Sequence, residues 1–169
     1  MQVCLQHSSS DEPPLSWYHL PVEVKRLLIA AANTWEDTTL SQSYIRRALA
    51  IANQSLDVLV AAYRYFFYKR NDAAALQIAN QLIEQIQQLE KLPNDWNLLA
   101  PILKQRKEDP NIRLYLNAYA ASGLVLARLG VMDEAKTISR RVSDIDDRRE
   151  FGAATVLQIL THPVEEEEE

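Results

Sequence analysis

The chain has 169 residues, of which 47% are hydrophobic and only three are glycine, a composition that favours one all-α domain with a real core over a turn-rich β fold. Its net charge of −5 lies in the five glutamates of residues 165–169, because the rest carries 23 − 5 = 18 acidic and 18 basic residues; such a neutral body argues against nonspecific DNA or RNA binding. Cys4 is the only cysteine, and no apolar run reaches the ~18 residues of a membrane span, so we expect a cytoplasmic protein without a disulfide.

The first helices are predicted to form a hairpin behind a polar N-terminal segment. Residues 1–16 contain adjacent prolines and few apolar side chains, and we expect them to be disordered. A folded domain then covers 17–162 and a disordered acidic tail covers 163–169. The first helix spans about 21–34, with an apolar face of Val24, Leu27, Leu28, Ala31 and Trp35. Asp37, Thr38 or Thr39 caps a second helix that ends near Ala52.

The next two helices contain the most aromatic stretch of the chain. Ser55 is predicted to cap a helix over 56–70, in which Tyr63, Phe66 and Phe67 share one face and Tyr65 and Tyr68 form an adjoining stripe. Either both stripes are packed, or the second one lines an open groove. The pair Asn71-Asp72 then breaks the chain, and a long helix continues to residue 92.

Residues 92–110 form an irregular insertion with three prolines. They allow a short helix that begins at Asn94 or Asp95 and carries Trp96, Leu98 and Leu99 into the core. The mixed-charge run 104–109 is most simply a solvated loop.

Residues 112–143 are predicted to form the central helical hairpin. Gly130 ends its first helix, because glycine adopts the left-handed conformation of a helix C-terminus without a steric penalty. Asp133 and Glu134 begin its second helix, where carboxylates oppose the positive end of the helix dipole. Gly123 is expected where the two helices cross closely. The first helix buries a face that consists of Leu114, Ala118, Ala121, Val125 and Leu129.

The C-terminal part is predicted to close the helical stack. The aspartates of 143–147 are interpreted as caps and first-turn charges rather than a metal site. A last helix, with Phe151, Ala154, Leu157 and Leu160 on one face, covers the open end and stops at Pro163.

Catalytic chemistry is sparse. The three histidines, His7, His19 and His162, are scattered near the ends of the chain, and the chain has no glycine-rich phosphate loop and no cysteine cluster. Cys4 and His7 alone do not make a metal site. We therefore expect a protein that is not an enzyme and has no cofactor or metal.

The run Gly123, Leu126, Gly130, Asp133-Glu134-Ala135 resembles the signature of a tetratricopeptide (TPR) repeat. A weaker copy lies in 56–86, where Ala75 corresponds to Ala135; the offset of 135 − 75 = 60 residues exceeds the ~34 of a tandem array. The resemblance implies an all-α, TPR-like stack of antiparallel hairpins with about seven to eight helices and a right-handed superhelical tendency.

TPR-like hairpins bind peptides or proteins with the inner helix of each pair, so the resemblance implies a protein or peptide partner. The family's groove positions fall on Asp57, Val60, Arg64, Phe67 and Tyr68 in the first copy, and on Asn117, Ala120, Leu124 and Arg128 in the second. The lysine-asparagine clamp that some TPR domains use for C-terminal carboxylates is not reproduced.

Residues 56–160 also resemble small TPR-like proteins encoded beside bacterial nitrogen-fixation genes. The tyrosine-rich helix and the LPNDW element of residues 92–96 carry this similarity. It implies a non-catalytic adaptor with an accessory role in nitrogen fixation. Two alternatives remain: a structural subunit that self-associates, for example as a homodimer, and an acidic chaperone of secretion substrates.

Overall fold

The computed structural model describes residues 19–161, and the chain divides into two units, Met1–Ile51 and Ala52–Glu169. The predicted disorder of 1–16 and of 163–169 lies outside the described residues. The single domain over 17–162 stays a prediction.

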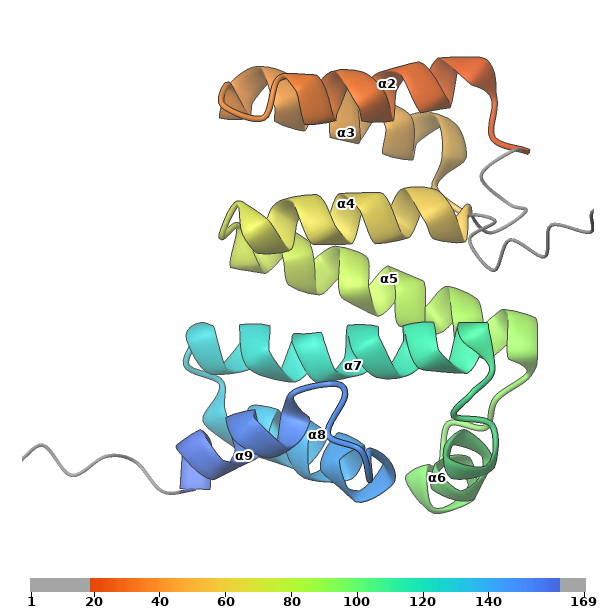
Figure 1. Cartoon of the computed structure of the whole chain (residues 1–169), viewed down its shortest axis with the longest axis vertical. Coiled ribbons are helices and arrows are strands. Elements are labelled where there is room, and N and C mark those ends of the chain that lie inside the picture. The colour runs from red at the N-terminus through yellow and green to blue at the C-terminus, as the bar shows by residue number, and fades with distance from the viewer. Residues whose placement is uncertain (1–18, 162–169) are drawn as a thin grey trace, which may run out of the picture. The chain divides into compact units, whose positions relative to one another are not determined.

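The prediction of an all-α fold is confirmed, because residues 19–161 contain eight helices and no strand (Figure 1). None of these helices combines the length and the apolarity that a membrane span requires. In chain order the helices are α2 Val22–Asn33, α3 Thr38–Ala52, α4 Leu56–Tyr68, α5 Asp72–Glu90, α6 Trp96–Gln105, α7 Pro110–Arg128, α8 Met132–Ile145 and α9 Ala153–Thr161.

The first unit contains α2 and nearly all of α3. The buried residues of α2 are Val24, Leu27, Leu28 and Ala31, as predicted. Trp35, predicted on the same face, is instead 37% exposed, because the helix has already ended at Asn33. Asp37 caps α3 by accepting a hydrogen bond from the Leu40 amide at 3.1 Å.

The second unit is built from helices that pack mainly on their neighbours. Helices α4 and α5 form one pair and α7 and α8 another; α5 packs on α7, and α9 covers α8 and part of α7. Figure 1 shows that α6 leaves this arrangement at the end where α5 stops and α7 begins. A short helix therefore projects from the junction of the two pairs, and it returns to contact α8.

Helix α7 is buried on more than the one face that its apolar period predicted. Ala118 and Val125 are buried, but Leu114 and Ala121 are only half-buried and Leu129 is 45% exposed. Further buried residues extend around much of the helix, since α5, α8 and α9 all contact it: Ile112, Tyr115, Leu116, Ala120, Ser122, Gly123 and Leu126.

The predicted close crossing of α7 and α8 is present at Gly123. A Cβ atom at this position would lie 3.1 Å from Ile138 Cγ2 and 3.3 Å from Ser139 Oγ, which is closer than ordinary van der Waals contact. Gly130 follows the end of α7 and has a φ of 84°, the left-handed conformation predicted for it. Asp133 and Glu134 occupy the first turn of α8, as predicted.

Side-chain caps begin three helices of the second unit, α5, α6 and α7. Asn71 and Asp95 accept hydrogen bonds from the amides of Ala74 and Asn97, and Asp109 does the same for Asn111 at the start of α7. Ser55 stands at the N-cap position of α4, but its side chain makes no capping hydrogen bond, so that part of the prediction is wrong.

Helix α6 differs from its prediction on two points. Leu99 and Leu103 are buried, but Leu98 is 62% exposed, because consecutive helical residues point about 100° apart and Leu98 lies outside the buried stripe. The run 104–109 is not a free loop either: Lys104 belongs to α6, and Arg106 and Asp109 are ion-paired.

Candidate protein-binding groove

The predicted groove residues lie on α4 and α7. In the first copy Asp57, Val60 and Phe67 are half-buried, Arg64 is exposed, and Tyr68 is 69% exposed. In the second copy Ala120 is buried, Leu124 is half-buried and Asn117 is exposed. One oxygen of Asp57, Oδ2, is buried without a hydrogen-bond partner.

The structure brings together one predicted groove residue from each TPR-like segment, Phe67 on α4 and Arg128 on α7. The guanidinium of Arg128 lies 4.8 Å from the centre of the Phe67 ring and 3.5 Å from Oδ1 of Asp72. Tyr63 packs on Phe67, with 5.9 Å between ring centres, and burial raises the pKa of Tyr63 to about 12. Phe67 is half-buried and Arg128 is exposed, and these two predicted groove residues already contact each other.

The aromatic stripe of Tyr65 and Tyr68 does not behave as a unit. Tyr65 is 5% exposed and belongs to the core, whereas Tyr68 is exposed. Only Tyr68 is therefore available to another molecule.

A surface hollow lies between α5, α7 and α8, away from the predicted groove residues. It has a volume of about 420 Å³, which is within the usual range of ligand pockets. Each helix contributes a strip about two turns long, so the hollow is elongated. We call it the α5–α7–α8 groove, and none of the predicted groove residues lines it. Its lining consists of Leu76, Asn80, Ile83, Tyr119, Ser122, Leu126, Glu134, Thr137, Ile138 and Arg141.

The groove combines an apolar floor with polar walls. Leu126 and Ile138 are buried, and Leu76 is half-buried against the core. Asn80, Glu134 and Thr137 are exposed. An apolar floor with a few fixed polar groups is typical of recognition sites, because apolar area supplies affinity and polar groups supply orientation.

Arg141 is the most strongly positioned polar group of the groove. It donates a hydrogen bond from Nη1 to the Tyr119 hydroxyl at 3.2 Å, and its guanidinium lies 4.9 Å from the centre of the Trp96 ring. Trp96 in turn packs on Tyr119, with ring centres 6.1 Å apart. Trp96 thus attaches α6 to the α7/α8 pair and holds the guanidinium in place.

Asn80 and Arg141 were not among the predicted groove residues. Asn80 interrupts the apolar spacing of Leu76 and Ile83, and that interruption was a usable signal. Arg141 follows another arginine in a polar stretch, and nothing local distinguishes the two. Only the packing of Trp96 and Tyr119 does so.

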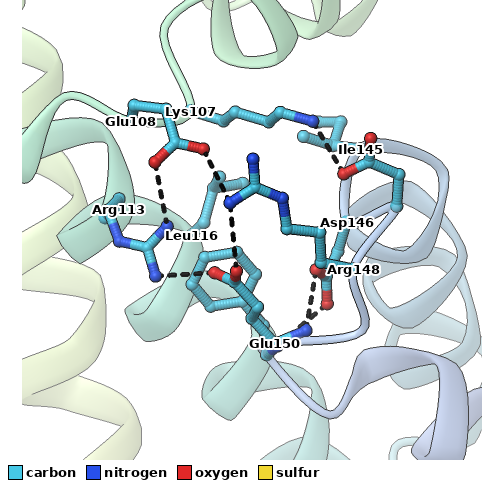
Figure 2. A pocket seen from close by; sticks show the side chains of 10 residues that line it. Lys107, Glu108, Arg113, Leu116, Ile145, Asp146, Arg148 and Glu150 are labelled. Atoms are coloured by element: carbon cyan, nitrogen blue, oxygen red, sulfur yellow. Dashed lines mark hydrogen bonds and ion pairs between the residues drawn. The ribbon is translucent and has the colours of Figure 1, made fainter.

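A second cavity holds charged groups but little space (Figure 2). Its volume is about 10 Å³, room for one water at most. Lys107 contacts Asp147 at 2.7 Å, Arg113 contacts Glu150 at 2.7 Å, and Arg148 bridges towards Glu108 at 3.3 Å. The cluster therefore joins the α6–α7 and α8–α9 connections rather than binding a ligand.

The aspartates of 143–147 do not serve as first-turn charges. Asp144 lies in the last turn of α8, and Asp146 follows it. The buried Asp146 carboxylate accepts hydrogen bonds from the amides of Glu150 at 2.8 Å and Phe151 at 2.9 Å (Figure 2). Asp146 therefore shapes the connection to α9.

A further charged cluster closes the α6 insertion at its base. Arg106 donates to both Glu90 and Asp109, and Asn111 donates to Glu90 at 2.8 Å. These hydrogen bonds lower the pKa of Glu90, with Arg106 as the largest cause, and Arg106 also lowers the pKa of Asp109. The last residue of α5 is thereby tied to the start of α7.

We expect Glu90→Gln to lower the free energy of unfolding at neutral pH, because it removes the ion pair with Arg106. The loss should be only about 1 kcal/mol, since solvent partly screens this ion pair. A carboxylate with a lowered folded-state pKa stabilises above its ordinary pKa and loses this effect as pH falls through the lowered value. Thermal melts at about pH 6 and about pH 3 should thus show a smaller acid loss for Glu90→Gln than for the wild type. Glu84→Gln, an exposed change on the same helix, should retain the full acid loss; equal losses in all three proteins would contradict the role of this pair.

Across residues 19–161, no group of three or more His, Cys, Asp or Glu side chains is placed to hold a metal ion. His19 is exposed. His7, His162 and Cys4 lie outside the described residues.

The second unit thus defines an all-α protein in which antiparallel helix pairs enclose a surface groove with a fixed arginine. No protein-family model matches the chain, and no solved structure matches it. It is 30% identical over 133 residues to an uncharacterized 19.8 kDa protein in the nifW 5′ region of Azotobacter chroococcum mcd 1, a match that covers 77% of this chain and 74% of the relative. The chain belongs to the same family as this Azotobacter protein. The match agrees with the predicted resemblance to proteins encoded beside nitrogen-fixation genes.

Proposed function

We propose that this protein is a non-catalytic accessory factor of nitrogen fixation that binds another protein in the α5–α7–α8 groove. The observation that carries the binding role is the groove itself, whose apolar floor of Leu126 and Ile138 meets the fixed guanidinium of Arg141. The relative in the nifW 5′ region supports the process.

The proposal includes a TPR-like organisation of the pairs α4/α5 and α7/α8. The close crossing at Gly123 and the turn at Gly130 support it, because TPR hairpins use small residues and glycine at these places. A partner-binding face formed by Asp57, Val60, Arg64, Asn117 and the other predicted positions of α4 and α7 stays a prediction beside the groove.

The groove can be tested by filling it. In a nitrogen-fixing bacterium that carries the gene, we expect its deletion to lower acetylene reduction and the wild-type gene to restore it. Asn80→Trp places a large side chain in the groove and should not restore activity. Gln77→Trp is the matched control, because Gln77 is exposed on the same helix and does not line the groove.

The purified variants should melt within a few degrees of the wild type, since both positions are exposed. A deletion without effect on acetylene reduction would overturn the proposed process. Full rescue by Asn80→Trp would overturn the groove as the binding site.

A second candidate is self-association through exposed apolar side chains. Tyr68 is 69% exposed, and Leu129, Val131 and Met132 in the α7–α8 turn are each more than 40% exposed. Sedimentation of the purified chain separates the two functions: a dimer that Tyr68→Ser dissociates supports self-association, and a monomer excludes it.

A further inference from the structure

We infer that the groove's occupant is a short extended segment of a partner protein with an acidic residue, apolar residues and a basic residue in that order or its reverse. This inference rests on the proposed function and specifies the partner's chemistry. The acidic side chain contacts Arg141, the apolar side chains lie on Leu126 and Ile138, and the basic side chain faces Glu134.

Arg141 forms no ion pair within residues 19–161. Four other arginines of the second unit contact carboxylates: Arg106, Arg113, Arg128 and Arg148. Arg141 instead donates to the neutral Tyr119 hydroxyl and lies over the Trp96 ring, and no carboxylate among residues 19–161 forms an ion pair with it. Because the ring and the hydroxyl fix the guanidinium plane, its free N–H groups are held ready for a carboxylate.

A negative charge, Glu134, lies on the same side of the groove as Arg141, which α8 forms. Glu134 and Arg141 are seven residues apart on α8, which is about 10 Å along a helix. They are too far apart to neutralise each other and they share one face. A ligand that satisfies both must carry both signs, so a purely acidic segment is disfavoured.

The polar side chains of the groove favour an extended segment. A helix pairs its own backbone groups, whereas an extended chain offers free N–H and C=O groups to side chains such as Asn80 and Thr137. Alternate residues of an extended chain share a face, so its first and fifth side chains, about 13 Å apart, can reach Arg141 and Glu134 while the second and fourth lie on the apolar floor. The exposed side chains of Asn80 and Thr137 can then hydrogen-bond the backbone of such a segment.

The test titrates the full-length, isotope-labelled protein with the peptide acetyl-Gly-Glu-Leu-Ser-Leu-Lys-Gly-amide and follows the NMR shifts; in an extended chain its Glu and Lys share one face and its two leucines share the other. We expect saturable shifts at the amides of α5 and α8 that line the groove. The uncharged peptide with Gln in place of Glu and Lys should bind about tenfold more weakly, because it lacks charge-assisted hydrogen bonds.

Arg141→Gln should weaken binding of the charged peptide about tenfold, and Arg140→Gln, an exposed change of equal charge next to it, should leave binding unchanged. Equal weakening by both variants, or shifts confined to other helices, would overturn the inference. If no charged peptide binds but Asn80→Trp still fails to restore acetylene reduction, the inferred chemistry is wrong and the proposed function stands. Binding that appears only after removal of residues 165–169 would make the chain's own tail the occupant and overturn the assignment to a partner.

Discussion

Gly123→Leu is expected to lower the free energy of unfolding by about 2–3 kcal/mol, because it overpacks a helix crossing that has no free space. Even the first added atom would lie 3.1 Å from Ile138 Cγ2, and the three that follow have to displace α8. Urea unfolding of the purified protein measures the change.

Two substitutions isolate the crossing as the cause. Gly123→Ala should be nearly neutral, because the tight contact with Ile138 opposes the gain of about 1 kcal/mol from removing a glycine within a helix. Asn117→Leu adds the same side chain at an exposed position of α7 and should change stability by less than about 0.5 kcal/mol. Equal stability of Gly123→Leu and the wild type would show that α7 and α8 do not cross there.

Asp146→Ala is expected to lower the free energy of unfolding by roughly 2–3 kcal/mol, because the amides of Glu150 and Phe151 lose their acceptor. The connection to α9 depends on these two hydrogen bonds. Phe151 and Ala153 belong to the core that α9 covers. Amide hydrogen exchange should therefore accelerate in α9 before it does so in α7.

Asp144→Ala is the matched control, since Asp144 is exposed two residues earlier; its stability and its α9 exchange should equal those of the wild type. Asp146→Asn should fall between the two, because the amide keeps one acceptor oxygen. An Asp146→Ala protein with wild-type exchange in α9 would contradict the proposed role.

The features that local patterns determine could be predicted from the sequence. Apolar spacing indicated the helices, and Gly130 indicated the turn of the central pair, because a left-handed C-terminus depends on one residue. Gly123 indicated the close crossing, because a glycine within a helix is tolerated where another helix approaches closely. These expectations needed no knowledge of distant segments.

The candidate site was less predictable because its residues meet through tertiary packing. Glu90 and Arg106 are 16 residues apart, and Lys107 and Asp147 are 40 apart; no periodicity links them. Arg141 differs from Arg140 through its contacts with Tyr119 on α7 and with Trp96 on the inserted α6. The TPR resemblance predicted a binding face on α4 and α7, whereas the groove lies between α5, α7 and α8.

In the second unit, helices pack mainly on the helices next to them in the chain, and this arrangement affects how the chain folds. Helix α5 packs on α4, α8 on α7 and α9 on α8, and the main contacts that pass over an intervening helix, α5–α7, α6–α8 and α7–α9, each pass over a single one. Such low contact order favours rapid folding, since few long loops must close before packing begins. The α4/α5 pair can therefore collapse on a ribosome-bound chain before α8 has been synthesised.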